Sequence, residues 1–72
     1  VIEVKSGVAD DTALTQLLAY MAEVKRTLGR APRGIIAAEN FTKRLRQAAE
    51  ALRNVKLVKI TVKVVVEKAE EV

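Results

Sequence analysis

Ile35-Ile36-Ala37-Ala38 is the stretch that decides the fold of this chain, because it is a short, unbroken apolar run between turn residues. Such a run fits a strand that is buried on both faces, as the inner strands of parallel sheets are. Pro32 and Gly34 provide the turn before it, and Asn40 after it is a candidate N-cap for a helix. The run therefore predicts the central strand of a parallel sheet.

Helical periodicity flanks this strand on both sides. The preceding helix is predicted over residues 11 to 28, with N-cap candidates in Asp10-Asp11-Thr12 and a stop at Gly29. The following helix is shorter, rich in Ala, and ends near Asn54. Apolar residues at helical spacing define both helices: Leu14, Leu17, Leu18, Met21, Val24 and Leu28 in the first, and Phe41, Leu45, Ala48, Ala49 and Leu52 in the second.

Two further strands complete the pattern. The first covers Val1 to Lys5, with Ile2 and Val4 expected to face the core, before a loop over residues 6 to 9. Residues 55 to 67 alternate between aliphatic and polar side chains, which predicts a long edge strand with one wet face. The order β-α-β-α-β predicts an α/β fold with a three-stranded, mostly parallel sheet and two helices.

Composition limits the chemistry that the chain can perform. Its 72 residues are 50% hydrophobic and 31% charged, which fits a folded domain or part of one. The absence of Cys and His excludes disulfides and every Cys or His nucleophile, so a metal would be a hard, oxygen-bound ion, Mg²⁺ or Mn²⁺. Because no run approaches the roughly 20 apolar residues of a membrane span and no signal sequence opens the chain, we expect a cytoplasmic protein without a membrane partner.

The triplet Glu3-Val4-Lys5 is the main candidate for a functional motif. In a strand its two charged side chains share one face about 6.6 Å apart, at the carboxyl end where open α/β sheets bind ligands. A second copy, Glu23-Val24-Lys25, lies within the predicted helix, where the two side chains are about 200° apart around the axis and cannot share a site. Read without further context, the first triplet is a surface ion pair of little energetic value.

The helix that follows adds Gln16 and Tyr20, which lie one turn apart beside its apolar stripe. A Glu-x-Lys strand followed by a helix with Gln-x-x-x-Tyr resembles the PD-(D/E)XK nuclease superfamily, and in particular the nuclease domain of NucS-type endonucleases. The resemblance rests on Ile2-Glu3-Val4-Lys5, Gln16-Leu17-Leu18-Ala19-Tyr20-Met21 and Arg33-Gly34-Ile35-Ile36-Ala37-Ala38. It implies that residues 1–67 are the C-terminal part of such a domain, with a restriction-endonuclease-like core, and that residues 68–72 are a charged tail.

The resemblance also implies a function, namely hydrolysis of DNA phosphodiester bonds with Mg²⁺ or Mn²⁺. Glu3 and the backbone carbonyl of Val4 would bind the metal. Lys5 would contact the scissile phosphate or the attacking water, while Gln16 and Tyr20 would orient Lys5 or the DNA backbone. Glu3, Lys5, Gln16 and Tyr20 are therefore the expected catalytic residues.

Basic residues outnumber acidic ones by 13 to 9, giving a net charge of +4 that allows a nucleic-acid partner. Lys43, Arg44 and Arg46 open the second helix, where cations are unfavourable for the helix dipole, so they favour a partner that carries phosphates. Together with Arg33 they are the predicted DNA contacts. The basic set also includes Arg30, Arg53 and Lys56, and an ordinary solvated surface is the alternative explanation for all of its members.

The family places a further metal-binding Asp on a strand upstream of the Glu-x-Lys strand. Because this sequence begins at Val1 inside that strand, we expect it to be a fragment that does not cut DNA alone. Asp10 and Asp11 are expected to be helix caps rather than substitutes for that ligand.

Two alternative functions remain. One is a non-catalytic module that binds nucleic acid or supports assembly on the same scaffold. The other, a flavodoxin-like or nucleotide-binding domain, lacks a Gly-rich phosphate loop, because Gly7 is the only glycine in the loop directly after the first strand. In every interpretation one sheet face would lack covering helices, so we expect a homodimer or another form of self-association.

Overall fold

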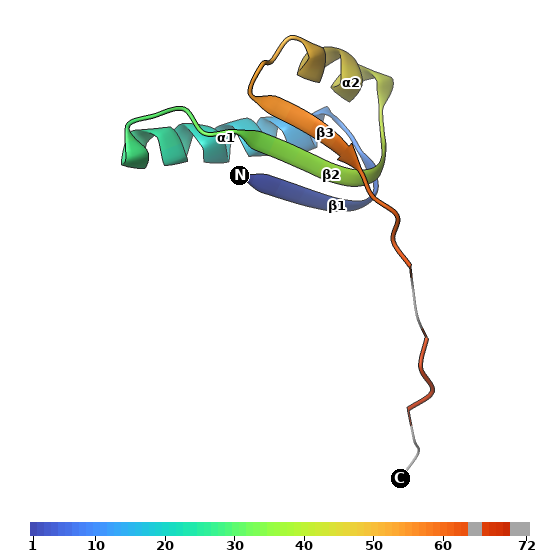
Figure 1. Cartoon of the computed structure of the whole chain (residues 1–72). Helices are drawn as coiled ribbons and strands as arrows, with labels where there is room; N and C mark the ends of the chain where they lie inside the picture. Colours follow the sequence, from blue (N-terminus) through green and yellow to red (C-terminus); the bar gives the residue numbers. More distant parts are fainter. Residues whose placement is uncertain (64–65, 70–72) are drawn as a thin grey trace.

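The structure, a computed structural model, describes residues 1–63 and 66–69. Along the chain the elements are β1 (Ile2–Ala9), α1 (Asp11–Leu28), β2 (Gly34–Phe41), α2 (Lys43–Glu50) and β3 (Val55–Lys59) (Figure 1). The strands form one parallel sheet in the order β1-β2-β3, with β2 in the centre. The predicted α/β fold with three parallel strands and two helices is therefore confirmed.

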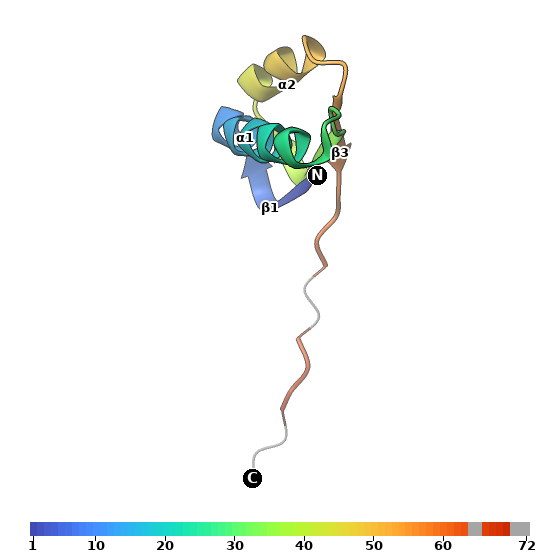
Figure 2. The same cartoon turned by 90° about the vertical axis from the view of Figure 1, so that its left-hand side faces the viewer.

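Both helices lie on the same face of this sheet (Figure 2). This is expected when two right-handed crossovers step in the same direction from one strand to the next. The core fills the space between the helices and this face, and its largest fully buried side chains are Leu17, Ile36 and Leu45. The other buried members of the cluster are Ala9, Ala13, Leu14, Met21, Ala38 and Val55.

Local signals fix both ends of α1 as the sequence predicts. The Asp10 side chain accepts a hydrogen bond of 3.0 Å from the Thr12 N–H at the first turn. Gly29 adopts a left-handed conformation with φ of 74°, and its N–H donates to the Lys25 carbonyl at 2.8 Å. Capping at both ends thus sets the length of this helix.

The predicted orientation of β1 is wrong. Ile2 and Val4 are 65% and 63% exposed, whereas Glu3 and Lys5 are half-buried. The cause is the register with β2, in which Glu3 pairs with Ile36, a residue fully buried beneath the helices. Paired residues of adjacent strands share a face, so Glu3 and Lys5 point to the side that the helices cover.

β1 also continues through residues 6–9, which the sequence predicts as a loop. The register with β2 shifts between Lys5 and Val8, so β1 carries an extra residue there. Gly7 has φ of 81°, and its N–H donates to Glu39 Oε1 at 2.8 Å. A β-bulge with a left-handed glycine explains this stretch, because glycine supports a bulge as readily as a turn.

The boundary between β2 and α2 lies later than predicted. β2 runs to Phe41, and the N-cap of α2 is Thr42, whose Oγ1 accepts from the Leu45 N–H at 3.2 Å. Asn40, the predicted cap, lies on the strand instead, where its Oδ1 accepts from the Phe41 N–H at 2.9 Å and from Arg46 Nη2 at 3.0 Å. Asn and Thr can both cap a helix. Asn40 and Phe41 pair with Val8 and Ala9 of β1, which keeps Asn40 in the strand and leaves Thr42 as the cap.

β3 is an edge strand, as predicted, but it ends at Lys59. The Ile60 N–H still donates to the Ala38 carbonyl at 2.9 Å, and residues 61–63 and 66–69 form no strand. The rest of the predicted strand, residues 64 and 65, and the end of the predicted tail, residues 70–72, lie outside the described residues.

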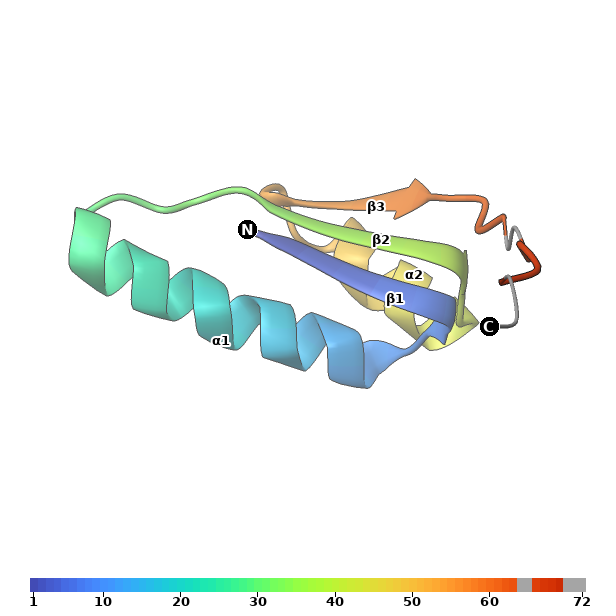
Figure 3. The same cartoon turned by 90° about the horizontal axis from the view of Figure 1, so that it is seen from below.

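The second face of the sheet has no helix over it within the described part of the chain (Figure 3). The register places one apolar row across this open face, from Val4 through Ala37 to Val58, which is 42% exposed. Ile2 and Ile35 form a neighbouring pair. The expected uncovered face is therefore present, whereas self-association stays a prediction.

Candidate functional site

Glu3 and Lys5 place a carboxylate and an ammonium group on the helix-covered face of the edge strand β1. Both side chains are half-buried, so solvent and ligands can still reach them. Neither is held by a hydrogen bond or an ion pair to any side chain that the structure describes. Their charges are therefore available to a ligand.

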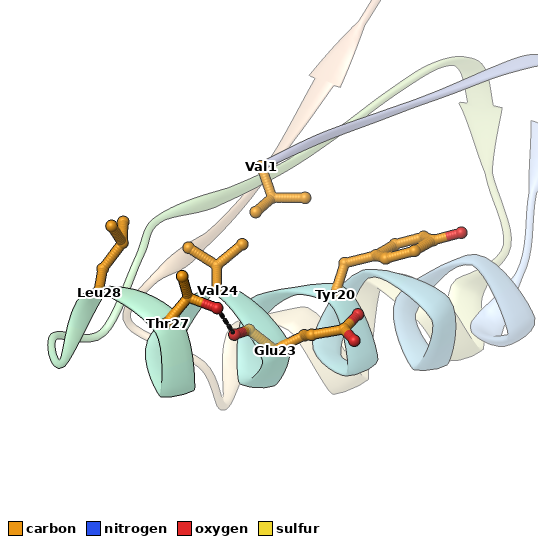
Figure 4. Close-up of a pocket in the computed structure, with 6 residues that line it drawn as sticks. All are labelled: Val1, Tyr20, Glu23, Val24, Thr27 and Leu28. Atoms are coloured by element: carbon orange, nitrogen blue, oxygen red, sulfur yellow. Dashed lines mark hydrogen bonds between the residues drawn. The ribbon is translucent and has the colours of Figure 1, made fainter.

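An apolar groove separates β1 from α1 and shows how the two elements are aligned. It is lined by Val1, Tyr20, Glu23, Val24, Thr27 and Leu28 (Figure 4). Because Val1 at the start of β1 meets residues near the end of α1, the helix runs antiparallel to the strand (Figure 3). The Tyr20 ring lies along the groove, with its hydroxyl pointing toward the start of α1 (Figure 4).

This alignment brings Gln16 and Tyr20 level with the Glu-x-Lys motif. From Val1 to Lys5 the strand advances about 13 Å. The stretch of α1 that lines the groove with Val1 runs from Tyr20 to Leu28, and Val24 is its middle residue. From Val24 back to Gln16 the helix covers about 12 Å. Lys5 is thus level with Gln16 and, by the same count, Glu3 is level with Tyr20.

The flank of α1 that carries these side chains is accessible. Gln16 is exposed and Tyr20 is 55% exposed, although Leu17 beside them is fully buried. They therefore border the packed surface, as predicted, instead of lying opposite it. Accessible polar groups therefore lie at matching levels of the two elements, a carboxylate and an ammonium on β1 and an amide and a phenol on α1.

The backbone of β1 adds a possible metal ligand. The Ile35 N–H donates to the Val1 carbonyl at 2.8 Å, so that carbonyl faces β2. Carbonyls alternate in direction along a strand, which turns the Glu3 carbonyl toward β2 and the Val4 carbonyl toward the free edge. The Val4 oxygen is therefore unused by the sheet.

These donors fit one part of a Mg²⁺ or Mn²⁺ site. The Glu3 carboxylate and the Val4 carbonyl are hard oxygen ligands, which both ions prefer. Over residues 1–63 and 66–69, no three His, Cys, Asp or Glu side chains form a group that could hold a metal. Mg²⁺ commonly keeps several waters and uses one or two carboxylates together with substrate phosphates, so the two oxygens supply a fraction of its shell.

Asp10 and Asp11 have other partners. Asp10 caps α1, as described above, and Asp11 Oδ2 lies 3.4 Å from Arg44 Nε in an exposed ion pair. Asp10 is thus a helix cap, as expected, whereas Asp11 is the first residue of α1 and not its cap. The ion pair joins the first turns of α1 and α2 and contributes little stability in water.

The four predicted DNA contacts do not lie together. Lys43, Arg44 and Arg46 belong to the first turns of α2, directly after β2, whereas Arg33 directly precedes β2. The eight residues of β2 separate the two groups by about 26 Å. The α2 group lies at the carboxyl end of the sheet, and Arg33 lies at the amino end. Glu3 and Lys5 lie between these ends, because β1 continues to Ala9, so the prediction that they stand at the carboxyl end of their strand is wrong.

Two of the three α2 cations have partners within the chain. Arg44 pairs with Asp11, and Arg46 donates to Asn40 while its guanidinium lies 6.0 Å from the centre of the Phe41 ring. No acidic residue occupies the first turn of α2. Lys43 is exposed, so the group still presents positive charge to solvent.

Glu23 is a further residue of this region, beyond those expected from the sequence. It lines the groove next to Tyr20, and Figure 4 shows its carboxylate lying beside the base of the tyrosine. Its spacing contained the signal, because residues seven apart on a helix share a side and Glu23 follows Gln16 by seven positions. Glu39, the acceptor for Gly7, had no such signal, since its role depends on strand register.

The site and fold together define a small parallel α/β domain with a Glu-x-Lys strand at its edge. Comparison of the chain with models of protein families, with curated protein sequences and with solved structures found no match. Within the described residues, no helix combines the length and the apolar character needed to cross a membrane.

Proposed function

We propose that this chain is the Glu-x-Lys part of a DNA endonuclease domain that hydrolyses phosphodiester bonds with Mg²⁺ or Mn²⁺. The observation that supports it most is the alignment of α1 with β1, which places Tyr20 level with Glu3 and Gln16 level with Lys5. A chance Glu-x-Lys triplet, such as the one at residues 23–25, has no such partners.

Each residue has a distinct role in this proposal. Glu3 and the Val4 carbonyl would hold the metal ion, and a bound Mg²⁺ or Mn²⁺ would activate water and neutralise the charge that develops on the phosphate. Lys5 donates hydrogen bonds to the phosphate and stabilises its negative charge. Gln16 and Tyr20 orient Lys5 or the DNA backbone from the neighbouring helix.

The first turns of α2 extend the proposed DNA contact. Lys43, Arg44 and Arg46 lie at the carboxyl end of the parallel sheet, the end at which open α/β sheets bind ligands. Their charges would meet phosphates of the same strand of DNA that enters the Glu3–Lys5 site. Arg33 lies about 26 Å from this group, before the amino end of β2, so it would meet a different part of the DNA.

Cleavage of duplex DNA by the natural gene product tests the proposal. With Mg²⁺ or Mn²⁺, Glu3→Gln and Lys5→Ala should each lower the cleavage rate by about 100-fold or more, because each removes a group that acts on the transition state. EDTA should abolish cleavage. Glu50→Gln, which removes one exposed charge at the far end of α2, should leave the rate unchanged. A Glu3→Gln protein that cleaves at the parent rate would refute the proposal.

The 72 residues alone are expected to bind DNA without cutting it, because within residues 1–63 and 66–69 Glu3 belongs to no group of three His, Cys, Asp or Glu side chains that could hold a metal. Metal-dependent cleavage by these residues alone, lost in Glu3→Ala, would contradict this expectation.

The same scarcity of carboxylates favours a second candidate, a non-catalytic module that binds nucleic acid or supports assembly. The two candidates differ in a simple measurement on the gene product. The module binds DNA with an affinity that falls steeply with salt, as phosphate contacts require, and cleaves it with neither metal. For either function we propose that the protein works in the cytoplasm and self-associates through the open face of its sheet.

A further inference from the structure

A concave site of about 370 Å³ lies at the amino ends of β2 and β3. Figure 1 shows where the chain enters these two strands. Its lining comprises Arg33, Gly34, Ile35, Arg53, Asn54 and Lys56. Three of these six residues are cationic and none is acidic. The groove beside α1 differs in both respects, because its one charged side chain is that of Glu23.

Three separate segments bring the cations together. Arg33 comes from the loop before β2, Arg53 from the turn after α2, and Lys56 from β3 itself. The segments are tied at the base of the cavity, where the Gly34 N–H donates to the Asn54 carbonyl at 2.7 Å. The cavity is therefore a product of the fold and not of one flexible loop.

The positive charge of this cavity is not neutralised by the described part of the protein. Within the described residues the structure contains one ion pair between side chains, Arg44 with Asp11, and it lies at the opposite end of the sheet from the cavity. Like charges that share a cavity repel one another when they are closer than the Debye length of about 8 Å at physiological salt. An anion bound between these cations is attracted by each of them, and this attraction offsets their mutual repulsion.

We propose that this cavity binds a phosphate group. Two guanidinium groups provide planar pairs of donors that match phosphate oxygens, and Lys56 adds a compact positive charge. The cavity is larger than a phosphate ion alone requires, which leaves room for the group that carries the phosphate. Free phosphate and the phosphates of a nucleic acid share this chemistry.

The cavity is separate from the Glu3–Lys5 site. Lys56 pairs in register with Ile35, and Ile35 pairs with Ile2, so the row lies on the open face of the sheet. Glu3 and Lys5 lie on the helix-covered face. The phosphate site therefore does not depend on the proposed nuclease function, and the failure of one leaves the other standing.

Titration of the ¹⁵N-labelled 72-residue chain with inorganic phosphate, at constant ionic strength set with NaCl, tests the proposal. Saturable shifts are expected at the amides of Gly34, Asn54 and Lys56. Arg53→Gln should weaken binding about tenfold, because it removes a charge-assisted contact. Arg26→Gln removes the same charge from the exposed last turn of α1 and should leave the affinity unchanged. Arg53→Lys, which keeps the charge, should lose less than Arg53→Gln.

A second titration with a short DNA duplex distinguishes the two sources of phosphate. Shifts with both ligands, or with DNA alone, support the site and indicate which source it prefers. Absence of saturable shifts with either ligand would overturn the proposal, as would shifts that Arg53→Gln and Arg26→Gln weaken equally. Thermal melting of each variant shows whether a loss of phosphate affinity is due to unfolding.

Discussion

Gly34 marks the closest approach of α1 to the sheet. A Cβ atom at this position would lie 2.9 Å from Leu17 Cδ2 and closer still to Met21 Sδ. We predict that Gly34→Ala lowers the free energy of unfolding by about 1–3 kcal/mol, measured by urea denaturation, because the helix must shift to admit the methyl group.

The companion change is Met21→Ala, which opens space above Gly34. In a double-mutant cycle the cost of Gly34→Ala should become smaller in the Met21→Ala background than in the parent. An equal cost in both backgrounds would show that crowding by Met21 is not the cause.

The bond from Gly7 to Glu39 holds the bulge of β1 and gives a second test. Glu39→Ala leaves the Gly7 N–H without its acceptor, and we predict a loss of about 1 kcal/mol in the free energy of unfolding. Glu39→Gln keeps an oxygen at the same position and should cost less. If the two variants are equally stable, the hydrogen bond does not support the bulge.

The residues of the candidate site could be identified from the sequence, but the face of the sheet on which two of them lie could not. Spacing places Glu3 beside Lys5 on a strand and Gln16 beside Tyr20 on a helix, since a strand and a helix each have a fixed period. Only the resemblance of the two motifs to a nuclease family links all four residues into one expected site. The face on which Glu3 and Lys5 lie was not predictable, because Ile2 and Val4 are more apolar and an isolated strand favours burying them. The pairing of β1 with β2 overrides that local preference.

Among the elements, α2 depends on a cap that the sequence did not identify uniquely. Thr42→Ala removes the side-chain acceptor for the Leu45 N–H, and we predict a loss of about 1 kcal/mol in the free energy of unfolding. Thr42→Ser, which keeps the hydroxyl, should be close to the parent in the same urea titration. A stable Thr42→Ala protein would place the functional cap elsewhere.

Elements defined by local signals were predicted well, and those defined by pairing were not. Both ends of α1 follow from Asp10 and Gly29, residues that act within one turn of themselves. Three strand boundaries depend instead on pairing with a neighbouring strand. They are the extension of β1 through Gly7, the extension of β2 to Phe41 and the end of β3 at Lys59. Strand pairing joins distant parts of the chain, so a single sequence shows it only indirectly.

At the scale of the whole molecule, one face of the sheet is open, because both helices that the structure describes cover the other face. Val4 and Val58 are exposed there in one apolar row, and such rows are uncommon on monomers. Two copies can cover this face by packing sheet against sheet about a two-fold axis. We therefore predict a concentration-dependent dimer in sedimentation equilibrium.

Val58→Lys places a charge in this row and should weaken the dimer about tenfold or more. Leu28→Lys is the matched control, because Leu28 is 62% exposed on α1, away from the open face. A chain that is monomeric and stable at high concentration would contradict the prediction, as would equal effects of the two substitutions.

The central claim is that β1 and α1 together form a site for a divalent cation and a phosphodiester. Mn²⁺-induced broadening of amide signals in ¹H–¹⁵N spectra of the chain bound to a DNA duplex tests it most directly, because broadening locates the ion. We predict that sub-stoichiometric Mn²⁺ broadens the amides of residues 2–6, Gln16 and Tyr20 first, that Glu3→Gln abolishes this selectivity, and that Glu50→Gln preserves it. Broadening centred elsewhere, or unchanged by Glu3→Gln, would contradict the claim.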